Sequence, residues 1–285
     1  MKNILIAGYQ GYSKISQVEN FVQSFKNVRR KQDELVVTYA GKRTAINDYL
    51  DSFDWVTTIK MKPTLNHKYV DRFRWYSDIL NESKAERALC CDFTDVIFQE
   101  NPFKWMEINQ TKDIIVCDEQ VKHLNKHEDW NLTMAKLAFP EEIKLIENKN
   151  ILNVGVVGGR TERVKNVLKS VYEKCKLPVE IVEAEIELVP DQAAYSILIH
   201  ATDYRIFGQK VGNTDTYCIT MGLLVSIPLF KIVAGKICNQ KGVPYCIVHQ
   251  YNRHSVINYE LDKNIFVAGD ENEVNAIFNC AEYEA

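Results

Sequence analysis

Residues 88–103 of the sequence are ALCCDFTDVIFQENPF, an apolar segment that is interrupted by two carboxylates. Asp92 and Asp95 lie three residues apart, directly after the apolar stretch 88–91, and the chain becomes apolar again at residues 96–98. Ionised carboxylates at the end of a buried strand need a partner, because burying an unpaired charge is prohibitively costly. We therefore expect this acidic pair to bind a cation, a hydroxyl-rich ligand, or a nearby Arg or Lys.

The segments before the acidic pair alternate between strand-like and helix-like patterns. Strands are expected over residues 2–7, 35–39, 55–59 and 88–91, and helices over residues 16–25, 44–50 and 69–80. This alternation predicts an α/β fold with a mostly parallel central sheet and helices on both faces. Such sheets bind ligands at the carboxyl ends of their strands, so the pair indicates a divalent-metal site that serves a nucleotide-linked ligand.

The second half of the chain is less regular. Strands are expected over residues 113–117 and 153–159, and helices over residues 161–175 and 191–200. The polar residues 121–131 are interpreted as an exposed loop. The apolar run 219–230 is interpreted as a buried segment, because its 12 residues are fewer than the ~20 that span a bilayer.

The composition is that of an ordinary globular protein. The 285 residues are 46% hydrophobic and 26% charged, and the net charge of -3 argues against a nucleic-acid partner. The eight cysteines show no C-x-x-C spacing, which favours reduced thiols in a cytosol-like compartment. The apolar start of the chain is too short for a secretory signal. We expect a cytoplasmic protein with no signal, anchor or membrane span.

Three further motifs follow the acidic pair in the sequence. They are NVGVVGG at residues 153–159, DQAAY at residues 191–195 and HQYNR at residues 249–253. With DFTDVIFQENPF at residues 92–103, these motifs resemble, in order and spacing, a family of GT-A fold glycosyltransferases. The members that the chain is most similar to include glycosyltransferases encoded by large DNA viruses of algae and related eukaryotic proteins. A virus-encoded member would act in the host cytoplasm.

The resemblance implies a GT-A-like, Rossmann-like single domain over residues 1–285. Residues 1–118 would form the nucleotide-binding half, and residues 119–285 the half that binds sugar and acceptor. The implied activity moves a sugar from a nucleotide-diphosphate sugar, UDP-linked in preference to GDP-linked, to a glycan or glycoprotein acceptor. Mn²⁺ or Mg²⁺ would neutralise the charge that builds on the diphosphate leaving group. The family likeness favours retention of the anomeric configuration.

The resemblance also assigns a metal site. It implies that Asp95 coordinates the metal directly, that Asp92 binds the donor ribose or the metal through water, and that His249 completes the shell. An imidazole beside two carboxylates suits Mn²⁺ better than Ca²⁺. The common family pattern has one residue between the acids and this chain has two, so the division of roles between them stays open. An acidic turn paired with Arg, and a structural His249, are the alternatives.

Asp191 and Gln192 are the candidate catalytic residues, at an expected exposed helix start close to the sugar. In an inverting enzyme Asp191 would be the general base that takes a proton from the acceptor hydroxyl. In a retaining enzyme either residue would lie near the anomeric carbon, and an oxygen of the leaving phosphate would take the proton instead. The alternative is that Asp191 only stabilises the helix dipole.

Other residues are candidates for donor binding. Ala7 and Gly8 end the first strand, where small residues let the backbone approach the nucleotide, and Tyr9 could stack on the base; turn chemistry is the alternative. The resemblance implies that an arginine of helix 69–80 pairs with the donor phosphates. Arg72 and Arg74 point about 200° apart on a helix, so only one can do so, and Arg72 is preferred.

The remaining candidates concern the sugar and the acceptor. Asn153 and Gly155 are expected to line the donor-sugar pocket, because an amide can both donate to and accept from hydroxyls. A packed strand–helix junction is the alternative for this segment. Arg253 would face the diphosphate or the acceptor, and Trp105 and Trp130 could stack on sugar rings.

Two other functions are compatible with the same residues. A nucleotide-sugar hydrolase or pyrophosphatase would use the same donor site and need no acceptor. A non-catalytic module that binds nucleotide sugars is the third interpretation, although acids kept at positions 92, 95 and 191 argue against it.

Overall fold

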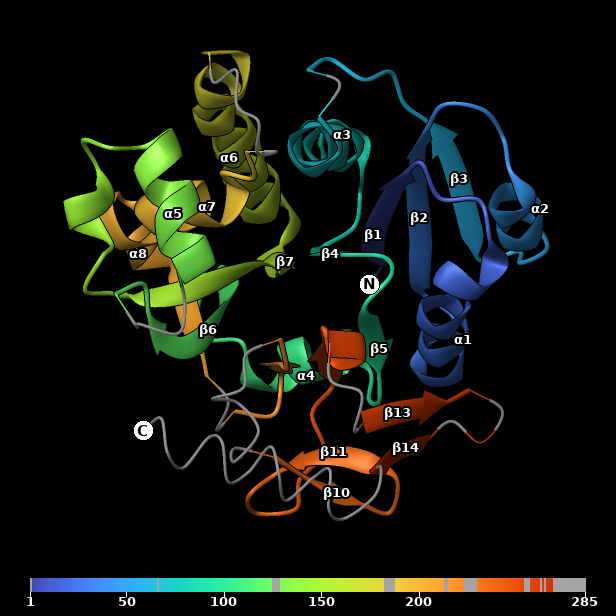
Figure 1. Cartoon of the computed structure of the whole chain (residues 1–285). Helices are drawn as coiled ribbons and strands as arrows, with labels where there is room; N and C mark the ends of the chain where they lie inside the picture. Colours follow the sequence, from blue (N-terminus) through green and yellow to red (C-terminus); the bar gives the residue numbers. More distant parts are fainter. Residues whose placement is uncertain are drawn as a thin grey trace.

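The computed structural model describes residues 2–65, 67–124, 129–181, 188–212, 215–222, 230–253, 257–261, 263 and 265–268. Its centre is a seven-stranded sheet with the order β3-β2-β1-β4-β7-β6-β8 (Figure 1). The strands are β1 (Asn3–Gln10), β2 (Asp33–Ala40), β3 (Val56–Lys60), β4 (Arg87–Cys91), β6 (Ile114–Lys122), β7 (Asn150–Arg160) and β8 (Gly208–Val211). Only β7 runs antiparallel to its neighbours β4 and β6; the other pairings are parallel.

Helices cover both faces of this sheet. The helices on one face are α3 (Lys68–Glu82), α5 (Asp129–Ala138), α6 (Thr161–Ile181) and α7 (Asp191–Ala201), and those on the other are α1 (Glu19–Val28), α2 (Ala45–Asp51) and α4 (Pro102–Asn109) (Figure 1). A short helix, α8 (Tyr204–Phe207), precedes β8. The expected α/β fold, with a mostly parallel central sheet and helices on both faces, is confirmed.

Two hydrophobic cores follow from the alternation of side chains along the strands. In β1, Leu5 faces the core that includes Phe21 and Phe25 of α1, whereas Ile6 faces the core that includes Phe73 of α3. A strand that is buried on both faces is apolar at nearly every position, and this is the pattern of residues 3–7. The central strands are thereby fixed between two helical layers, and the carboxyl ends of the parallel strands β1, β2 and β4 lie at one edge of the sheet.

The expected exposed loop at residues 121–131 is wrong for the part that the structure describes. β6 continues to Lys122, and beyond it the backbone amides of His123 and Leu124 still donate to the carbonyls of Lys149 and Glu147. The His123 side chain is fully buried, and burial lowers its pKa to about 4, so the imidazole is neutral. The polar composition does not predict this, because the backbone pairing next to β7 makes the segment strand-like, with Val121 and His123 buried and Lys122 and Leu124 exposed. Residues 125–128, which include His127, lie outside the described residues.

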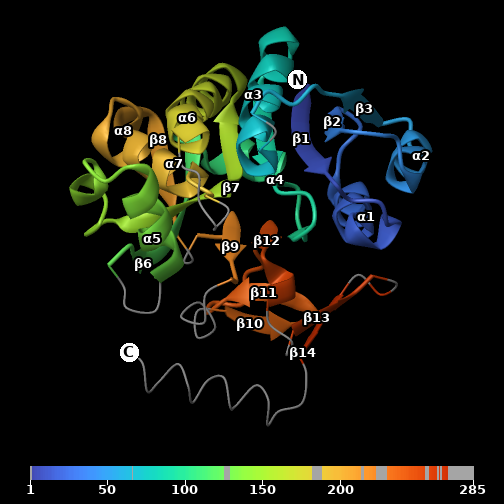
Figure 2. The same cartoon turned by 45° about the horizontal axis from the view of Figure 1, so that its top comes forward.

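A smaller sheet connects the middle of the chain to its end. It has the order β5-β12-β9, formed by β5 (Val96–Phe98), β12 (Ile247–His249) and β9 (Cys218–Thr220). Figure 2 shows β9 and β12 between the central sheet and two hairpins, β10 (Phe230–Val233) with β11 (Lys236–Asn239) and β13 (Ile257–Glu260) with β14 (Ile265–Ala268). Ala234 and Gly235 both have positive φ, which closes the first hairpin with a tight turn.

The apolar and cysteine-containing segments agree with expectation where they are described. Ile219, Met221 and Phe230 are buried, while residues 223–229 of the same apolar run lie outside the described residues. The seven cysteines in the described part of the chain are free and buried. In that same part, no helix combines the length and the apolar character needed to cross a membrane.

Candidate metal and donor site

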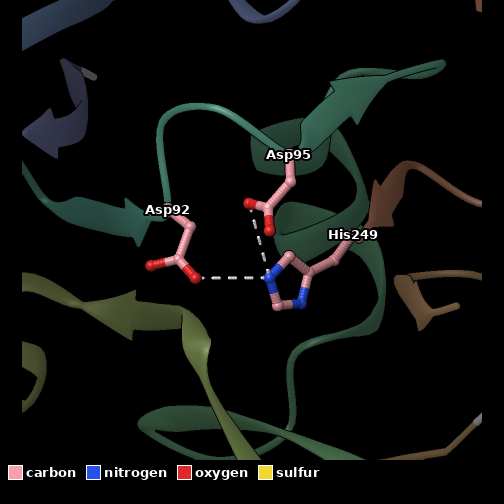
Figure 3. Close-up of side chains that lie close together, drawn as sticks. All are labelled: Asp92, Asp95 and His249. Atoms are coloured by element: carbon pink, nitrogen blue, oxygen red, sulfur yellow. Dashed lines mark ion pairs between the residues drawn. The ribbon is translucent and has the colours of Figure 1, made fainter. Parts of the chain in front are cut away.

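Asp92, Asp95 and His249 converge beyond the carboxyl end of β4 (Figure 3). The two acids belong to the turn that joins β4 to β5, and His249 ends β12, which pairs antiparallel with β5 so that His249 lies opposite Val96. The His249 Nε2 atom is 3.3 Å from Asp92 Oδ2 and 3.8 Å from Asp95 Oδ1. One ligand atom from each residue lies within 4.8 Å of the others, the spacing of a metal-binding group.

Gly155 of β7 provides the space behind this group. The Asp92 amide donates to the Gly155 carbonyl at 2.8 Å, which holds the turn against β7. A Cβ atom at position 155 would lie 2.6 Å from Asp92 Oδ2 and 2.7 Å from the His249 ring. Gly155 is expected to line the donor-sugar pocket, but the space that its missing side chain leaves is filled by the side chains of Asp92 and His249.

The turn after β12 is held by the same acidic loop. Gln250 has a positive φ of 56°, which is unusual for a residue with a side chain, and its amide donates to the Asp95 carbonyl at 2.7 Å. Arg253 follows in a short 3-10 helix, and its Nη2 atom is 3.9 Å from Asp95 Oδ2. His249 and Arg253 therefore approach Asp95 from one tightly bent segment.

The electrostatics of the group fit a divalent cation. His249 is 1% exposed, and burial lowers its pKa, an effect that nearby Asp95 opposes only in part, so the imidazole is neutral at neutral pH. Among the described residues, the buried atoms His249 Nε2 and Asp95 Oδ1 have no hydrogen-bond partner. Buried polar atoms rarely stay unsatisfied. One imidazole nitrogen with carboxylate oxygens is a donor set that could hold a divalent metal ion.

Arg72 of α3 connects Asp92 to Asp191. Its Nη1 atom donates to Asp92 Oδ1, and its Nη2 atom donates to Asp191 Oδ2 at 3.0 Å. The expectation that Asp191 is exposed is wrong, since the residue is only 4% exposed. Its charge is tolerated there because Arg72 pairs with one carboxylate oxygen and the Gln192 amide donates to the other at 2.9 Å.

Arg74 is not among the residues that line the cavity next to the acidic pair. Its guanidinium donates to Thr64 Oγ1 and lies 3.5 Å from Asp78 Oδ2. The reason is helical geometry, because side chains two residues apart point in nearly opposite directions. Of the two candidate arginines, only Arg72 reaches the acidic group.

A cavity of 170 Å³ opens beside the acidic pair, between the end of β1, α3 and the β4–β5 turn. Three cationic side chains line it, from Lys68, Arg72 and Arg253, together with the carboxylates of Asp92 and Asp95. A mixed lining of this kind can hold an anionic ligand next to a cation.

The residues at the end of β1 contribute differently from what the sequence predicts. Ala7 is fully buried in the core on the α1 side, so it cannot contact a nucleotide. Gly8 borders the cavity, but a Cβ there would lie 2.3 Å from Thr38 Oγ1, so a glycine is needed for packing. Tyr9 also borders the cavity, yet it is 4% exposed and stacks with Tyr39 and Phe93, each at 6.0 Å between ring centroids.

A half-buried aromatic near Tyr9 is better placed to meet a base. Tyr12 lines the cavity too, and it is more exposed than Tyr9. The buried rings around Tyr9 leave no open face for a base, whereas Tyr12 follows β1 by two residues and lies outside the sheet. Alternating strand residues face opposite layers, and a pattern of aromatic residues alone does not reveal which one reaches the surface.

Asn153 has a buried acidic partner that was not expected. Its Nδ2 atom donates to Glu119 Oε1 of β6 at 2.8 Å, while its own Oδ1 lacks a hydrogen bond among the described residues. Glu119 also acts to raise the pKa of His249, so it belongs to the same region. The signal was present in the sequence: Asp118 and Glu119 follow the apolar residues 114–117, just as Asp92 follows residues 88–91.

The side-chain amide of Gln192 pairs with another side-chain amide. Its Nε2 atom donates to Asn131 Oδ1 of α5 at 3.1 Å, which links the start of α7 to the start of α5. Of the two tryptophans considered for sugar stacking, Trp105 is held inside the fold, where its Nε1 donates to Thr216 at 3.1 Å and its ring packs on Tyr217. Trp130 is 51% exposed.

Comparisons with known proteins identify the fold. Neither a protein-family model nor a curated protein sequence matches the chain. Its structure is similar to the crystal structure of an active-site mutant of LgtC, a glycosyltransferase of the GT-A type. The TM-score is 0.52 at 10% sequence identity, and the match covers 86% of each chain. At this identity the likeness establishes a GT-A-like, Rossmann-like fold.

Proposed function

We propose that this chain is a metal-dependent glycosyltransferase that moves a sugar from a nucleotide-diphosphate sugar to a glycan or glycoprotein acceptor. The observation that carries the proposal is the convergence of Asp92, Asp95 and His249 at the strand ends of a GT-A-like fold. The nucleotide is UDP in preference to GDP. In this proposal the chain is encoded by a virus, like the family members that it resembles, and it acts in the host cytoplasm.

In the proposed metal site, some ligand atoms would bind the ion and others are already bonded to the protein. Asp95 and His249 would hold Mn²⁺ or Mg²⁺ through buried atoms that have no other hydrogen bond among the described residues. Asp92 would offer Oδ2 alone, because Arg72 occupies its Oδ1. The bound ion supplies positive charge that stabilises the diphosphate leaving group.

The cavity is the proposed place of the diphosphate. Lys68, Arg72 and Arg253 line it, and their donors can bind phosphate oxygens while the carboxylates beside them bind the ion. Gly8 and Tyr12 would border the nucleoside. These residues support a nucleotide-binding half that spans residues 1 to about 118. Arg253 would be added to it from the second half of the chain.

The hydroxyl groups of the sugar would meet the polar residues of the second half. Asn153, Glu119 and Gln192 offer amide and carboxylate groups there, which is the chemistry that hydroxyls require. These positions support a sugar- and acceptor-binding half over about residues 119–285. The whole chain, residues 1–285, would then act as one glycosyltransferase domain.

Retention is the proposed stereochemical outcome. Both oxygens of Asp191 are already engaged, one by Arg72 and the other by the Gln192 amide. A carboxylate held in this way is a poor general base for an acceptor hydroxyl, because it must give up a charge-assisted hydrogen bond to take the proton. The proton would pass to an oxygen of the leaving phosphate, with Asp191 and Gln192 orienting the sugar.

The test is the replacement Asp95→Asn, which keeps the size of the side chain. We expect the variant to fold normally and to lose sugar transfer together with the Mn²⁺-dependent rise of Tm that UDP produces, since a ligand that binds only the folded state raises its stability. Asp48→Asn is the matched control, because Asp48 is exposed and its side chain pairs with the exposed Arg43, the one ionic partner it has among the described residues.

The outcomes separate the alternatives. Normal transfer by Asp95→Asn in Mn²⁺ would show that the metal assignment is wrong. Release of sugar or phosphate at full rate without any acceptor would indicate a hydrolase or pyrophosphatase. Binding of nucleotide sugars without turnover across a broad donor panel would indicate a binding module.

A further inference from the structure

The start of α5 lies directly over the segment that leads into α7. Gln192 donates to Asn131 at 3.1 Å, and the Met134 sulfur is 3.5 Å from the Val189 amide. Figure 1 shows the two helices side by side. Since Arg72 joins Asp191 to Asp92, a continuous chain of contacts runs from the acidic pair to the first turn of α5.

Trp130 stands in that first turn with half of its surface exposed to solvent. It precedes Asn131 and lies one helical turn before Met134, and residues four apart share a face of a helix. The face of α5 that carries Trp130 is therefore the face whose Met134 contacts Val189, two residues before Asp191.

The chemistry of this rim matches a sugar ring. An exposed indole offers a flat apolar face, and the half-buried Gln192, whose side chain donates to the buried Asn131, adds an amide of the kind that can hydrogen-bond to hydroxyls. A pyranose has one face of C–H groups and an edge of hydroxyls, so it can use both features at once. Large aromatic side chains that are exposed beside a polar site are a common feature of ligand-binding surfaces.

We propose that Trp130 is the platform on which a sugar ring of the acceptor stacks, at the α5 end of this chain of contacts. The inference rests on the proposed glycosyltransferase function, and it specifies the acceptor as a carbohydrate. Trp130 acts on the acceptor alone. The donor is held at the other end of the chain of contacts, by Asp92, Asp95 and the cations of the cavity.

The experiment compares wild type, Trp130→Ala and Trp130→Phe on a glycan array in the presence of UDP and Mn²⁺. Ile108→Ala is the matched control, because Ile108 is an apolar side chain on α4 that is 72% exposed and lies on the opposite face of the sheet. Glycans that the wild type binds then serve as acceptors in transfer assays, where KM is measured separately for acceptor and donor.

We expect Trp130→Ala to raise the acceptor KM about tenfold, the effect of losing an aromatic contact of ordinary strength, with an unchanged donor KM. Trp130→Phe should restore most of the affinity, and Ile108→Ala should behave as wild type. Tm measurements will show that the exposed substitutions leave the fold intact.

Two results would overturn the inference while leaving the proposed function in place. One is an unchanged acceptor KM in Trp130→Ala. The other is a wild-type protein that binds no arrayed glycan but transfers sugar to a polypeptide lacking glycans, which would make the acceptor a protein surface. If UDP and Mn²⁺ did not raise the Tm of the wild type, the proposed function itself would be refuted, since that rise does not involve Trp130.

Discussion

Two concave regions of the molecule differ in how well their polar groups are satisfied. The larger is a groove of 770 Å³ beside α1, α4 and the hairpins, where Arg30 pairs with Glu107 at 2.7 Å and Lys236 pairs with Glu100 at 2.6 Å. The smaller is the 170 Å³ cavity next to Asp95. There, buried atoms lack hydrogen bonds within the described part of the chain.

The difference teaches that unmet polar chemistry marks a ligand site better than volume does. A buried polar atom without a partner costs free energy, so a fold keeps one only where something else satisfies it or where function requires it. The groove has already paired its charges with each other. The cavity has unpaired buried atoms beside its carboxylates, which a bound cation would satisfy. The predictions below test this contrast from the largest expected effect to the smallest.

Gly155→Ala should have the largest effect. The added Cβ would lie 2.6 Å from Asp92 Oδ2 and 2.7 Å from the His249 ring, so at least one of these side chains must move. We expect Mn²⁺ affinity to fall about 100-fold, the upper range for disturbing the support of metal ligands. Titration of Mn²⁺ with the Tm of the UDP complex as readout measures the loss.

Gly212→Ala is the control for Gly155→Ala. A Cβ at Gly212 would meet only the flexible side chain of Gln120, so metal binding should be unchanged. If Gly155→Ala bound Mn²⁺ as tightly as the wild type, the three side chains would not be a metal site of the geometry described.

Arg72→Lys should have the next largest effect. A lysine keeps the charge but cannot donate to Asp92 and Asp191 together, because its ammonium lacks the forked geometry of a guanidinium. Misplacement of a catalytic group by about 1 Å can lower a rate on the order of 100-fold. We therefore expect kcat for transfer to fall by between about tenfold and about 100-fold. Steady-state kinetics with saturating donor measures it.

Arg74→Lys is the matched variant, two residues away on the same helix. Its partners, Thr64 and Asp78, lie outside the site, so kcat should stay within twofold of the wild type, as is usual for a surface charge pair. Equal losses in both variants would mean that α3 as a whole, and not the Arg72 bridge, is what transfer requires.

The acidic pair and the sheet could be predicted from the sequence because both depend on local pattern. Asp92 follows an apolar strand, and a charge in that position has few interpretations. The partner of Asp95 depends on long-range pairing: β5 and β12 are separated by about 150 residues of sequence, and nothing in either strand specifies the register that places His249 opposite Val96. His249 is predicted as a metal ligand only through the resemblance to a known family.

The incorrect expectations share a physical cause, since exposure is a property of the assembled fold. Asp191 is expected at the surface because it lies at a helix start, but Arg72 reaches it from another helix and allows it to be buried. His123 was expected in a loop because its neighbours are polar, but β7 pairs beside it. Tyr9 was expected to meet a base, but two rings from other elements cover it.

Glu119→Gln should have a smaller and more selective effect. The amide keeps an acceptor for Asn153 but removes the negative charge from the proposed sugar pocket. Because charge-assisted hydrogen bonds are about twice as strong as neutral ones, we expect the donor KM to rise by up to about tenfold. Inhibition by UDP, which lacks the transferred sugar, should be unchanged. Asp118→Asn is the neighbouring control, and equal weakening of UDP and donor would place Glu119 outside the sugar pocket.

The smallest effect is expected in the groove, where Glu107→Gln removes one partner of Arg30 and should leave transfer and Mn²⁺ binding unchanged. The pair is partly exposed, so its loss should lower the free energy of unfolding by at most about 1 kcal/mol at neutral pH. Arg30 lowers the pKa of Glu107 below its usual value, so this contribution is present above the ordinary glutamate pKa and is lost as the pH falls through the lowered one. Urea unfolding of both proteins should therefore show a difference in the free energy of unfolding at pH 7 that disappears in acid. A loss of transfer activity in Glu107→Gln at pH 7 would mean that the groove, despite its paired charges, contributes to function.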